Sequence, residues 1–259
     1  MKKLSLILIF VLAPFLGLFA QERGFYPLIE NYSYQSYNAG TANWSIIEDD
    51  RGIMYFSNNR GILEYDGQNW ELIESPKQQV ARSLAKDEKG VIYVGFVGDI
   101  GFLKSDTKGK TIFSSLKSKL TIEHQVFKEV WNTFSLNEKI YFQTKSKLFR
   151  WDGREMKVMA SEAYFQRSSI IDGKFFIGVW DVGLCILDED RFELAVIQPE
   201  FAKKNIYVIQ SYSNDTLLVG TQKQGIYLCD SKSVQPFITE ADHLIKNQLY
   251  SPGDRKSVV

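Results

Sequence analysis

Short apolar and aromatic runs, each bounded by polar turns, make up the chain after its first twenty residues. The clearest are IMYFS, VIYVGF, KIYFQ, KFFIGV and TLLVG, which are rich in β-branched and aromatic residues. No stretch in this part of the sequence keeps an apolar period of about 3.6 residues with helix caps at its ends. The pattern therefore predicts an all-β protein whose main helical feature is a turn around Lys117 to Phe127.

Five segments of the chain align with one another. They cover residues 46–73, 84–113, 134–159, 169–196 and 210–237. Each holds a turn, a strand with an aromatic or apolar pair, a short polar or Gly-bearing loop, a strand ending near Asp, a tight turn and a last strand. By subtraction, the spacings are 38, 48, 35 and 42 residues between the aligned positions Tyr55, Tyr93, Tyr141, Phe176 and Leu218. Propeller blades repeat at roughly 40 to 50 residues.

The turns inside the repeats suit antiparallel hairpins. Asp66-Gly67 and Asp152-Gly153 supply the positive-φ residue that a tight hairpin requires. Because carboxylates recur at such positions, we expect turn roles for them and not a general acid–base pair. These carboxylates are Asp49, Asp66, Asp152 and Asp230.

Repetition explains how such blades become stable. A single blade has two faces to cover and two open edges, and radial stacking covers the faces while leaving only short, protected edges. We therefore predict a β-propeller of four-stranded antiparallel blades, with about five blades in residues 44–250. The aromatic residues at the strand ends should lie in the core between blades, and they are Phe56, Phe142, Trp151 and Phe176.

Composition and charge exclude some functions. The chain has 259 residues, 44% of them hydrophobic, which is enough apolar material for one large core or two ordinary ones. Its 31 basic and 31 acidic side chains cancel, and Lys and Arg are scattered, so no basic stripe is available for a phosphate backbone. Nucleic acid is not an expected partner of this segment.

The N-terminus is typical of an exported protein. Met1-Lys2-Lys3 is a basic start, an apolar run follows, and Ala20 offers a small residue for cleavage, so residues 1–20 are predicted to be a signal peptide and 21–43 a lead-in segment. An uncleaved membrane anchor is the competing interpretation, although the run is short for about 30 Å of hydrocarbon. No Cys follows the cleavage point, which disfavours a lipoprotein.

Candidate catalytic and metal chemistry is sparse. Neither His124 nor His243 has a Cys, His or carboxylate at metal-ligand spacing. Glycine-rich GFVGDIG lies between two strands and does not open a helix, so it does not aim helix N–H groups at a phosphate. We expect no metal and no cofactor. Cys185 and Cys229 are expected to be two buried thiols, with a disulfide as the alternative.

Binding residues are expected in the loops between the second and third strands, because loops of different propeller blades converge at the ends of the central channel. Trp180 with adjacent Asp181 suits a sugar ring by stacking and hydrogen bonding, although packing against a neighbouring blade is the alternative. The candidate ligand-binding residues are Asn59, Arg60, Asp99, Lys145, Trp180, Asp181 and Lys223.

The repeats resemble a known family. The pattern of an acidic turn, Gly, an apolar-aromatic pair, a loop, Gly with Leu or Ile, an apolar residue and Asp is similar to the two-component regulator propeller repeat. Residues 43–73 and 219–230 carry the pattern most clearly, whereas Ser146-Lys147 replaces the usual Gly in the third repeat. Residues 27–44 are similar to the start of exported sensors of Bacteroidetes-like bacteria.

The resemblance implies a periplasmic sensor region of an inner-membrane protein. Such propellers usually have seven blades, followed by an immunoglobulin-like domain, one transmembrane helix and a histidine kinase or helix-turn-helix output, and the full-length protein is expected as a homodimer. Five blades would then be an incomplete propeller, with a sixth beginning at Asn247 to Tyr250. In this interpretation the segment itself is not an enzyme, and it meets the membrane only through a C-terminal helix missing from the sequence.

Two further functions stay open on the sequence. One is an exported propeller enzyme acting on polysaccharide, and the other is a protein-binding scaffold. Residues 251–259 are expected to be a truncated or non-native tail, because Asp254 to Val259 are what the codons GAT CGG AAG AGC GTC GTG would encode, a string that resembles a sequencing adapter. The natural gene is therefore expected to be longer. An oligosaccharide or another small ligand is the expected partner.

Overall fold

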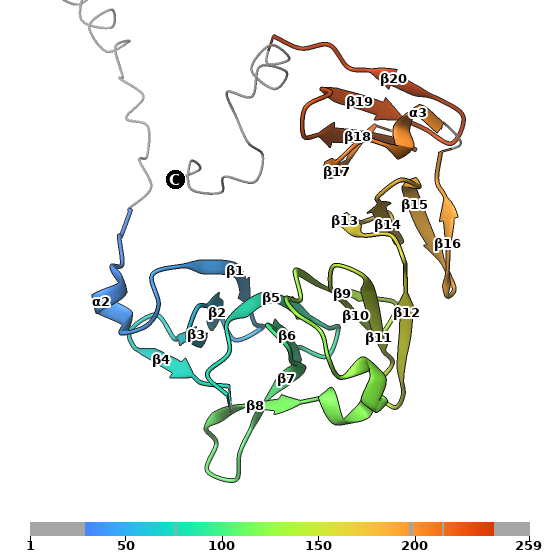
Figure 1. Cartoon of the computed structure of the whole chain (residues 1–259). Helices are drawn as coiled ribbons and strands as arrows, with labels where there is room; N and C mark the ends of the chain where they lie inside the picture. The colour runs from blue at the N-terminus through green and yellow to red at the C-terminus, as the bar shows by residue number, and fades with distance from the viewer. Residues whose placement is uncertain (1–28, 76, 197–198, 214, 241–259) are drawn as a thin grey trace, which may run out of the picture. The chain divides into compact units, whose positions relative to one another are not determined.

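The computed structural model describes residues 29–75, 77–196, 199–213 and 215–240 (Figure 1). The chain divides into two compact units, Met1–Ser33 and Tyr34–Val259. The first has irregular backbone over residues 29–33, and the second holds every described strand. The predicted signal peptide, the start of a sixth repeat and the predicted tail lie outside the described residues.

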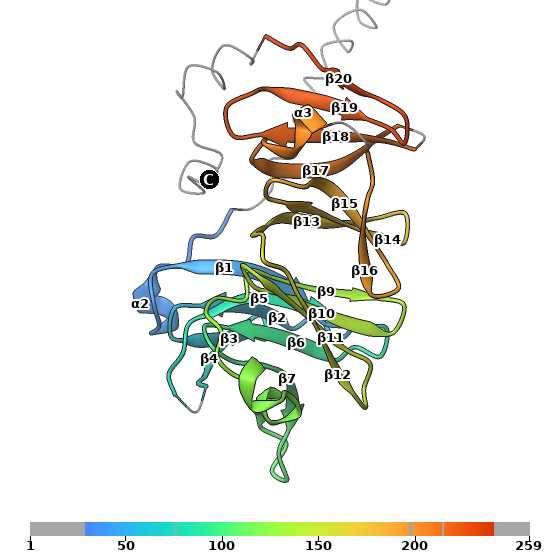
Figure 2. The same ribbon diagram turned by 45° about the vertical axis from the view of Figure 1, so that its right-hand side comes forward.

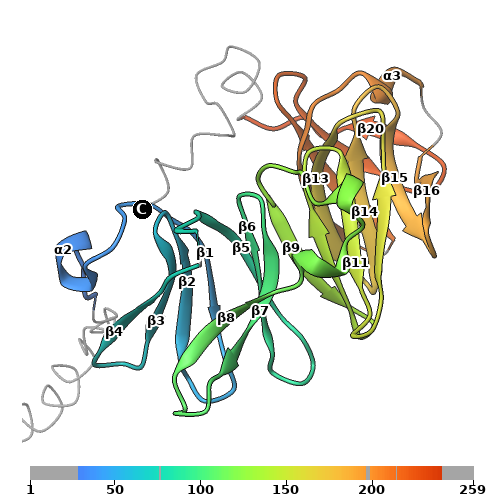
Figure 3. The same cartoon turned by 60° about the horizontal axis from the view of Figure 1, so that its bottom comes forward.

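The described strands form five separate sheets of four strands each, and in every sheet the strand order follows the sequence (Figure 1). The first three blades consist of β1 (Asn43–Glu48), β2 (Met54–Asn58), β3 (Gly61–Tyr65) and β4 (Trp70–Ile73), then β5 (Ala81–Lys86), β6 (Ile92–Phe96), β7 (Ile100–Ser105) and β8 (Thr111–Ser115), then β9 (Asn132–Leu136), β10 (Lys139–Gln143), β11 (Lys147–Trp151) and β12 (Met156–Ala160). The last two consist of β13 (Phe165–Ile171), β14 (Lys174–Val179), β15 (Gly183–Asp188) and β16 (Arg191–Leu194), then β17 (Ile206–Ser213), β18 (Thr216–Thr221), β19 (Ile226–Cys229) and β20 (Val234–Pro236). All pairs are antiparallel, and Figure 3 shows β1 to β4 side by side in the first sheet.

Helix is confined to four short elements of the described chain. Two 3₁₀ turns, η2 (Lys117–Lys119) and η3 (Ile122–His124), lie where the sequence predicted a helical turn. The others are α2 (Tyr34–Tyr37), which packs against β4, and α3 (Pro199–Ala202), which packs against β15. Neither α2 nor α3 was predicted. Within the described part of the chain, no helix has the length and apolar character needed to cross a membrane.

Consecutive blades contact one another through their first strands. β1 contacts β5, β5 contacts β9, β9 contacts β13, and β13 contacts β17, as the neighbouring strands of Figure 2 illustrate for the last pair. Each hydrophobic cluster contains residues of two consecutive blades, for example Tyr55 and Ile62 of the first blade with Val94 and Phe96 of the second. Apolar contact between blades therefore stabilises the repeat, since one four-stranded sheet cannot bury its own faces.

The predicted core aromatics lie in or against these clusters. Phe142 is fully buried and Trp151 nearly so, both in the cluster between the second and third blades. Phe176 packs against the cluster between the fourth and fifth blades. Phe56 is half-buried, with its ring centroid 5.3 Å from that of Trp70. Cys185 and Cys229 are free and buried in two different clusters.

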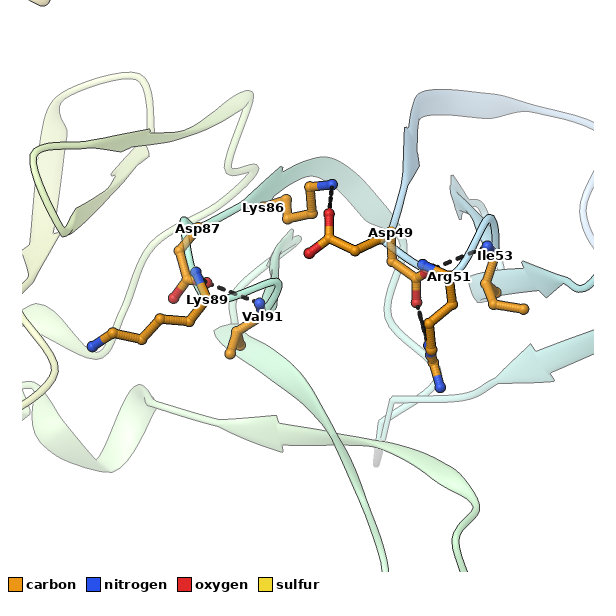
Figure 4. Close-up of polar contacts among 8 residues, drawn as sticks. Asp49, Arg51, Ile53, Lys86, Asp87, Lys89 and Val91 are labelled. Atoms are coloured by element: carbon orange, nitrogen blue, oxygen red, sulfur yellow. Dashed lines mark hydrogen bonds and ion pairs between the residues drawn. The ribbon is translucent and has the colours of Figure 1, made fainter.

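The predicted turn carboxylates hold the hairpins. Asp49 Oδ1 accepts the main-chain N–H groups of Arg51 and Ile53 at 2.8 and 3.0 Å. In the second blade, Asp87 Oδ1 accepts those of Lys89 and Val91 at 2.9 and 2.8 Å (Figure 4). Asp66, Asp152 and Asp230 likewise each accept two main-chain N–H groups, which lower their pKa values. The predicted turn role is confirmed.

Candidate functional site

At one end of each sheet lie the connecting segments from which a ligand site could be built. The first strand of each blade begins there, and the turn between the second and third strands lies at the same level, because Asn43 at the start of β1 pairs with Asn58 at the end of β2. The same register places Ala81 opposite Phe96 and Ile206 opposite Thr221. We call this end the turn face. The connections between successive blades also reach their next first strand there.

A β-bulge interrupts the first strand at the turn face in four of the five described blades. The register shifts between Asn43 and Ser45, Ala81 and Ser83, Phe165 and Ser168, and Ile206 and Val208. A bulge leaves the extra residue out of the ladder and re-aims its side chain. The residues placed this way are Trp44, Arg82, Gln166, Arg167 and Tyr207.

Arg82 lies between two tryptophans. Its guanidinium carbon is 4.0 Å from the centroid of the Trp44 ring and 5.2 Å from that of Trp131, which directly precedes β9. Arg82 Nε and Nη1 are buried and have no hydrogen-bond partner among the described residues. Each aromatic contact contributes about 0.5–2 kcal/mol, whereas a buried donor without an acceptor costs about 1–3 kcal/mol. The stack thus holds the cation in place and leaves donors without an acceptor.

The two rings are held differently. Trp44 Nε1 donates to Asn59 Oδ1 at 2.7 Å, and the side chain is half-buried. The Trp131 main-chain N–H donates to Gln143 O at 2.8 Å, but 48% of the residue is exposed. Asn59, a predicted ligand-binding residue, therefore fixes the inner ring of the stack, whereas the Trp131 ring is the one that faces solvent.

A second aromatic cluster lies on the turn face of the third and fourth blades. The Lys145 ammonium is 3.9 Å from the centroid of the Tyr164 ring, and the Trp180 main-chain N–H donates to Tyr164 O at 2.8 Å. Tyr164 is 52% exposed and Trp180 39% exposed. Asp181, next to Trp180, is exposed and has a left-handed φ of 61°, which Asp tolerates better than most residues. The structure therefore joins two predicted residues to Tyr164, Lys145 through its ammonium and Trp180 through its main chain, and Asp181 follows Trp180 in the chain.

The other predicted residues lie apart from this cluster. Asp99 is buried, and its Oδ1 accepts from Ser115 Oγ at 2.6 Å and from the main chain of Ile100 at 2.8 Å, so it holds the β6–β7 turn. The carboxylate of Asp99 is thus engaged within the turn, and its role in ligand binding stays a prediction. Lys223 is exposed on the turn of the fifth blade.

Arg60 contacts Glu74 and the main chain of Asn38. Its Nη2 lies 3.6 Å from Glu74 Oε1, and Nη1 donates to Asn38 O at 3.3 Å. It lines a cavity of about 600 Å³ together with Trp70 of β4 and Phe113 of β8. Because β4 and β8 are the last strands of their sheets, this cavity lies at the side of the blades opposite their first strands.

The contacts of His124 and the grouping of possible metal-ligating side chains bear on metal binding. His124 Nε2 lies 3.4 Å from Glu123 Oε1 on η3. Over the residues that the structure describes, no group of three or more His, Cys, Asp or Glu side chains is placed to hold a metal ion. His243 lies outside that part of the chain.

Comparison with solved structures gives the fold. Virginiamycin B lyase from Staphylococcus aureus matches with a TM-score of 0.55 and 13% identity, over 79% of this chain and 72% of that one. BBS1N in complex with ARL6DN matches with a TM-score of 0.53 and 13% identity, over 78% and 67% of the two chains. The chain is an all-β propeller of about five blades.

A third similar structure is described as the extracellular domain of a hybrid two-component system from B. thetaiotaomicron. It matches the propeller with a TM-score of 0.46 and 14% identity, over 80% of this chain and 34% of that one, a similarity too low to carry an argument. No protein-family model matches the chain, and no curated protein matches it. These identities are low enough that the comparisons establish the fold of the propeller and not its function.

Polar side chains join the blades of the propeller near the turn face. Ser83 Oγ lies 2.7 Å from Thr133 Oγ1, which links the second and third blades. Gln143 Nε2 donates to Gln166 O at 2.7 Å and so links the third and fourth blades. Gln166 Oε1 in turn accepts the main-chain N–H of Ile206 at 2.8 Å. The bulged strands are therefore fixed relative to their neighbours, which gives the aromatic clusters a rigid support.

Trp44, Arg82, Trp131 and Tyr164 belong to the site but were not predicted. A sequence signal for part of this set exists, because Trp44-Ser45, Arg82-Ser83 and Arg167-Ser168 repeat a large side chain followed by Ser. The aligned repeats begin at residues 46, 84 and 169, just after each pair. Because the repeats are aligned on the second strand of each blade, the bulged residues of these first strands lie outside the aligned segments.

Proposed function

We propose that this chain is the ligand-sensing propeller of an exported signalling or transcription-regulating protein, and that it binds its ligand without transforming it. The observation that carries the proposal is the exposed cluster of Tyr164, Trp180 and Lys145 on the turn face. Flat aromatic side chains next to a few polar groups are the usual surface of a small-ligand site. An oligosaccharide is the proposed ligand class, since sugar rings stack on aromatic faces while hydroxyls bond to Lys145 and Asp181.

The absence of catalysis is part of the proposal. Glycan cleavage commonly uses a pair of carboxylic acids at the scissile bond. The turn carboxylates Asp49, Asp66, Asp152 and Asp230 accept main-chain N–H groups, and Asp99 accepts from Ser115. These groups stabilise turns, which supports binding as the role of the turn face.

Export and signalling are supported by the sequence. The basic start, the apolar run and Ala20 favour translocation of the chain, and the repeats resemble those of periplasmic sensors. Signalling through such a domain requires that the ligand bind one arrangement of the receptor more tightly than another. Gln143 and Gln166 hold consecutive blades together through hydrogen bonds. Such contacts suit a domain in which ligand binding changes the contacts with neighbouring domains and leaves the blades themselves unchanged.

Two assays on the same preparation test the proposal. The unfolding temperature is measured with and without a panel of oligosaccharides, because a ligand that binds only the folded state stabilises it. The same panel is then incubated with the protein and analysed for chain length. We expect at least one stabilising oligosaccharide that is recovered intact. Shortening of a stabilising oligosaccharide would indicate an enzyme, and stabilisation by none would indicate a scaffold.

A further inference from the structure

The stack of Trp44, Arg82 and Trp131 has properties that packing alone does not explain. A guanidinium held between two rings gains from both cation–π contacts. Packing does not, however, supply acceptors for Arg82 Nε and Nη1, which are buried and unpartnered among the described residues. Buried donors of this kind are rare in folded proteins and call for a specific reason.

The position of the stack is also informative. Arg82 is the bulged residue of β5 at the turn-face end of that strand, so it lies outside the regular pairing of the second blade. Trp44 is the bulged residue of β1, and Trp131 precedes β9, so three consecutive blades contribute one side chain each. A site at which consecutive blades converge is where a propeller can hold a ligand.

The Trp131 ring is held less firmly than the Trp44 ring. Trp44 is tied to Asn59 by its indole N–H. Trp131 is 48% exposed, and its hydrogen bond to Gln143 O is donated by its main chain. Rotation of the Trp131 ring about its side-chain bonds would remove one of the two rings of the stack without changing a sheet. Rotamer changes of exposed side chains are fast and common on binding.

We propose that Arg82 is an anion-binding subsite that receives a carboxylate of the ligand, with Trp131 as the ring that moves aside. The planar fork of Arg pairs with a carboxylate through two parallel hydrogen bonds. Trp44 then packs against the ring that carries the carboxylate. This inference rests on the proposed function and makes it more specific: the ligand is an acidic oligosaccharide, such as one built of uronic acids.

The test compares oligogalacturonate with neutral oligogalactan of the same length, using tryptophan fluorescence of the wild-type protein and calorimetry. We expect the acidic chain to bind about tenfold or more tightly than the neutral one, as one charge-assisted bidentate contact would give. Binding of the acidic chain should weaken as salt is raised, because salt screens the charge on an accessible guanidinium. Equal affinities for the two chains would overturn the subsite and leave the proposed function standing.

Variants separate the two proposals further. Arg82→Gln should lower affinity for oligogalacturonate about tenfold and leave any binding of the neutral chain unchanged. The control is Arg154→Gln, in the exposed turn that follows β11 at the opposite end of the blade. It should change the affinity for neither chain. If Arg82→Gln does not fold, Trp131→Phe decides instead: it should bind the acidic chain but lose part of the fluorescence change. An unaltered fluorescence change in Trp131→Phe would contradict the inference. Failure of oligogalacturonate to bind the wild type would also overturn the inference, whereas the proposed function fails only if no oligosaccharide of the panel stabilises the protein.

Discussion

The guanidinium carbon of Arg82 in the second blade lies 4.0 Å from the ring centroid of Trp44 in the first. Because Trp44 also donates to Asn59, it connects a turn of its own blade to a cation of the next. This contact joins two bulged first strands at the end of the sheets where the proposed ligand would bind.

The two tryptophans of the stack should differ in their effect on stability. Trp44→Ala should lower the free energy of unfolding by about 2–3 kcal/mol, because it removes half-buried aromatic surface, a hydrogen bond and a cation–π contact together. Trp131→Ala should lower it by about 1 kcal/mol or less, because about half of that residue is exposed. Urea denaturation followed by circular dichroism measures both. Equal losses in the free energy of unfolding would show that the Trp131 ring is held as firmly as the Trp44 ring.

The Asp49 turn should depend on the acceptor oxygen of its side chain. Burial alone would raise the pKa of Asp49, but the hydrogen bonds from Arg51 and the main chain of Ile53 outweigh it and lower that pKa. Asp49→Ala should lower the free energy of unfolding by about 1–2 kcal/mol, and Asp49→Asn by less, because the amide keeps one acceptor oxygen. Glu88→Gln, exposed in the equivalent turn of the second blade, is the matched control and should be silent in the same denaturation experiment. A loss in the control as large as in Asp49→Ala would count against the turn interpretation.

An ion triad should make the contact between the third and fourth blades sensitive to acid. Asp190 pairs with both Arg150 and Lys157. Partial burial acts to raise the pKa of Asp190, but the hydrogen bond from Lys157 and the charge of Arg150 leave that pKa below its ordinary value. A carboxyl with a lowered folded-state pKa stabilises the fold above its unfolded pKa of about 3.9. That stability is lost as the pH falls through the folded-state value.

Asp190→Asn tests the triad. It should lower the free energy of unfolding at pH 7 by about 1 kcal/mol at low salt and by less at high salt. The difference between wild type and variant should begin to shrink as the pH falls below the unfolded pKa of about 3.9 and disappear once the pH has passed the lowered folded-state pKa. Asp188→Asn, exposed at the end of β15, is the control. A wild-type-to-variant difference that is constant between pH 7 and pH 3 would contradict the account.

The two cysteines should behave as protected thiols. Burial raises the pKa of Cys185 to about 11 and that of Cys229 to about 12, so both stay protonated at neutral pH. Because the thiolate is the reactive form, neither should react with a thiol reagent in the native protein. Both should react once the protein is unfolded in denaturant without a reductant. Detection of no free thiol after unfolding would show a disulfide.

The repeat pattern predicted most of the fold because blade formation is local. A strand run, an Asp-anchored turn and a second run lie within a few residues of one another, and Asp49 and Asp66 can be recognised without knowing their neighbours in space. Helices α2 and α3 were not predicted, because four-residue helices have no apolar period to detect.

The binding residues were harder to predict because they depend on contacts between blades. Lys145 and Trp180 were expected from their loops, but Tyr164, which holds them together, lies in a connection between blades. Asp99 and Arg60 lie in the expected turns, yet the carboxylate of Asp99 accepts from Ser115 and the guanidinium of Arg60 pairs with Glu74. Loop position therefore indicated which segments meet, whereas the contacts of each side chain depend on neighbours that the sequence pattern does not identify.

The most direct measurement for the central claim is a calorimetric titration of the wild type and of the double variant Tyr164→Ala/Trp180→Ala with the oligosaccharides that stabilise the wild type. Tyr164 is 52% and Trp180 39% exposed, so the variant should fold with only a modest loss of stability. The account predicts that the wild type binds and that the variant loses about tenfold or more in affinity, since two aromatic contacts are removed. Unchanged affinity in the folded variant, or no binding by the wild type, would contradict it.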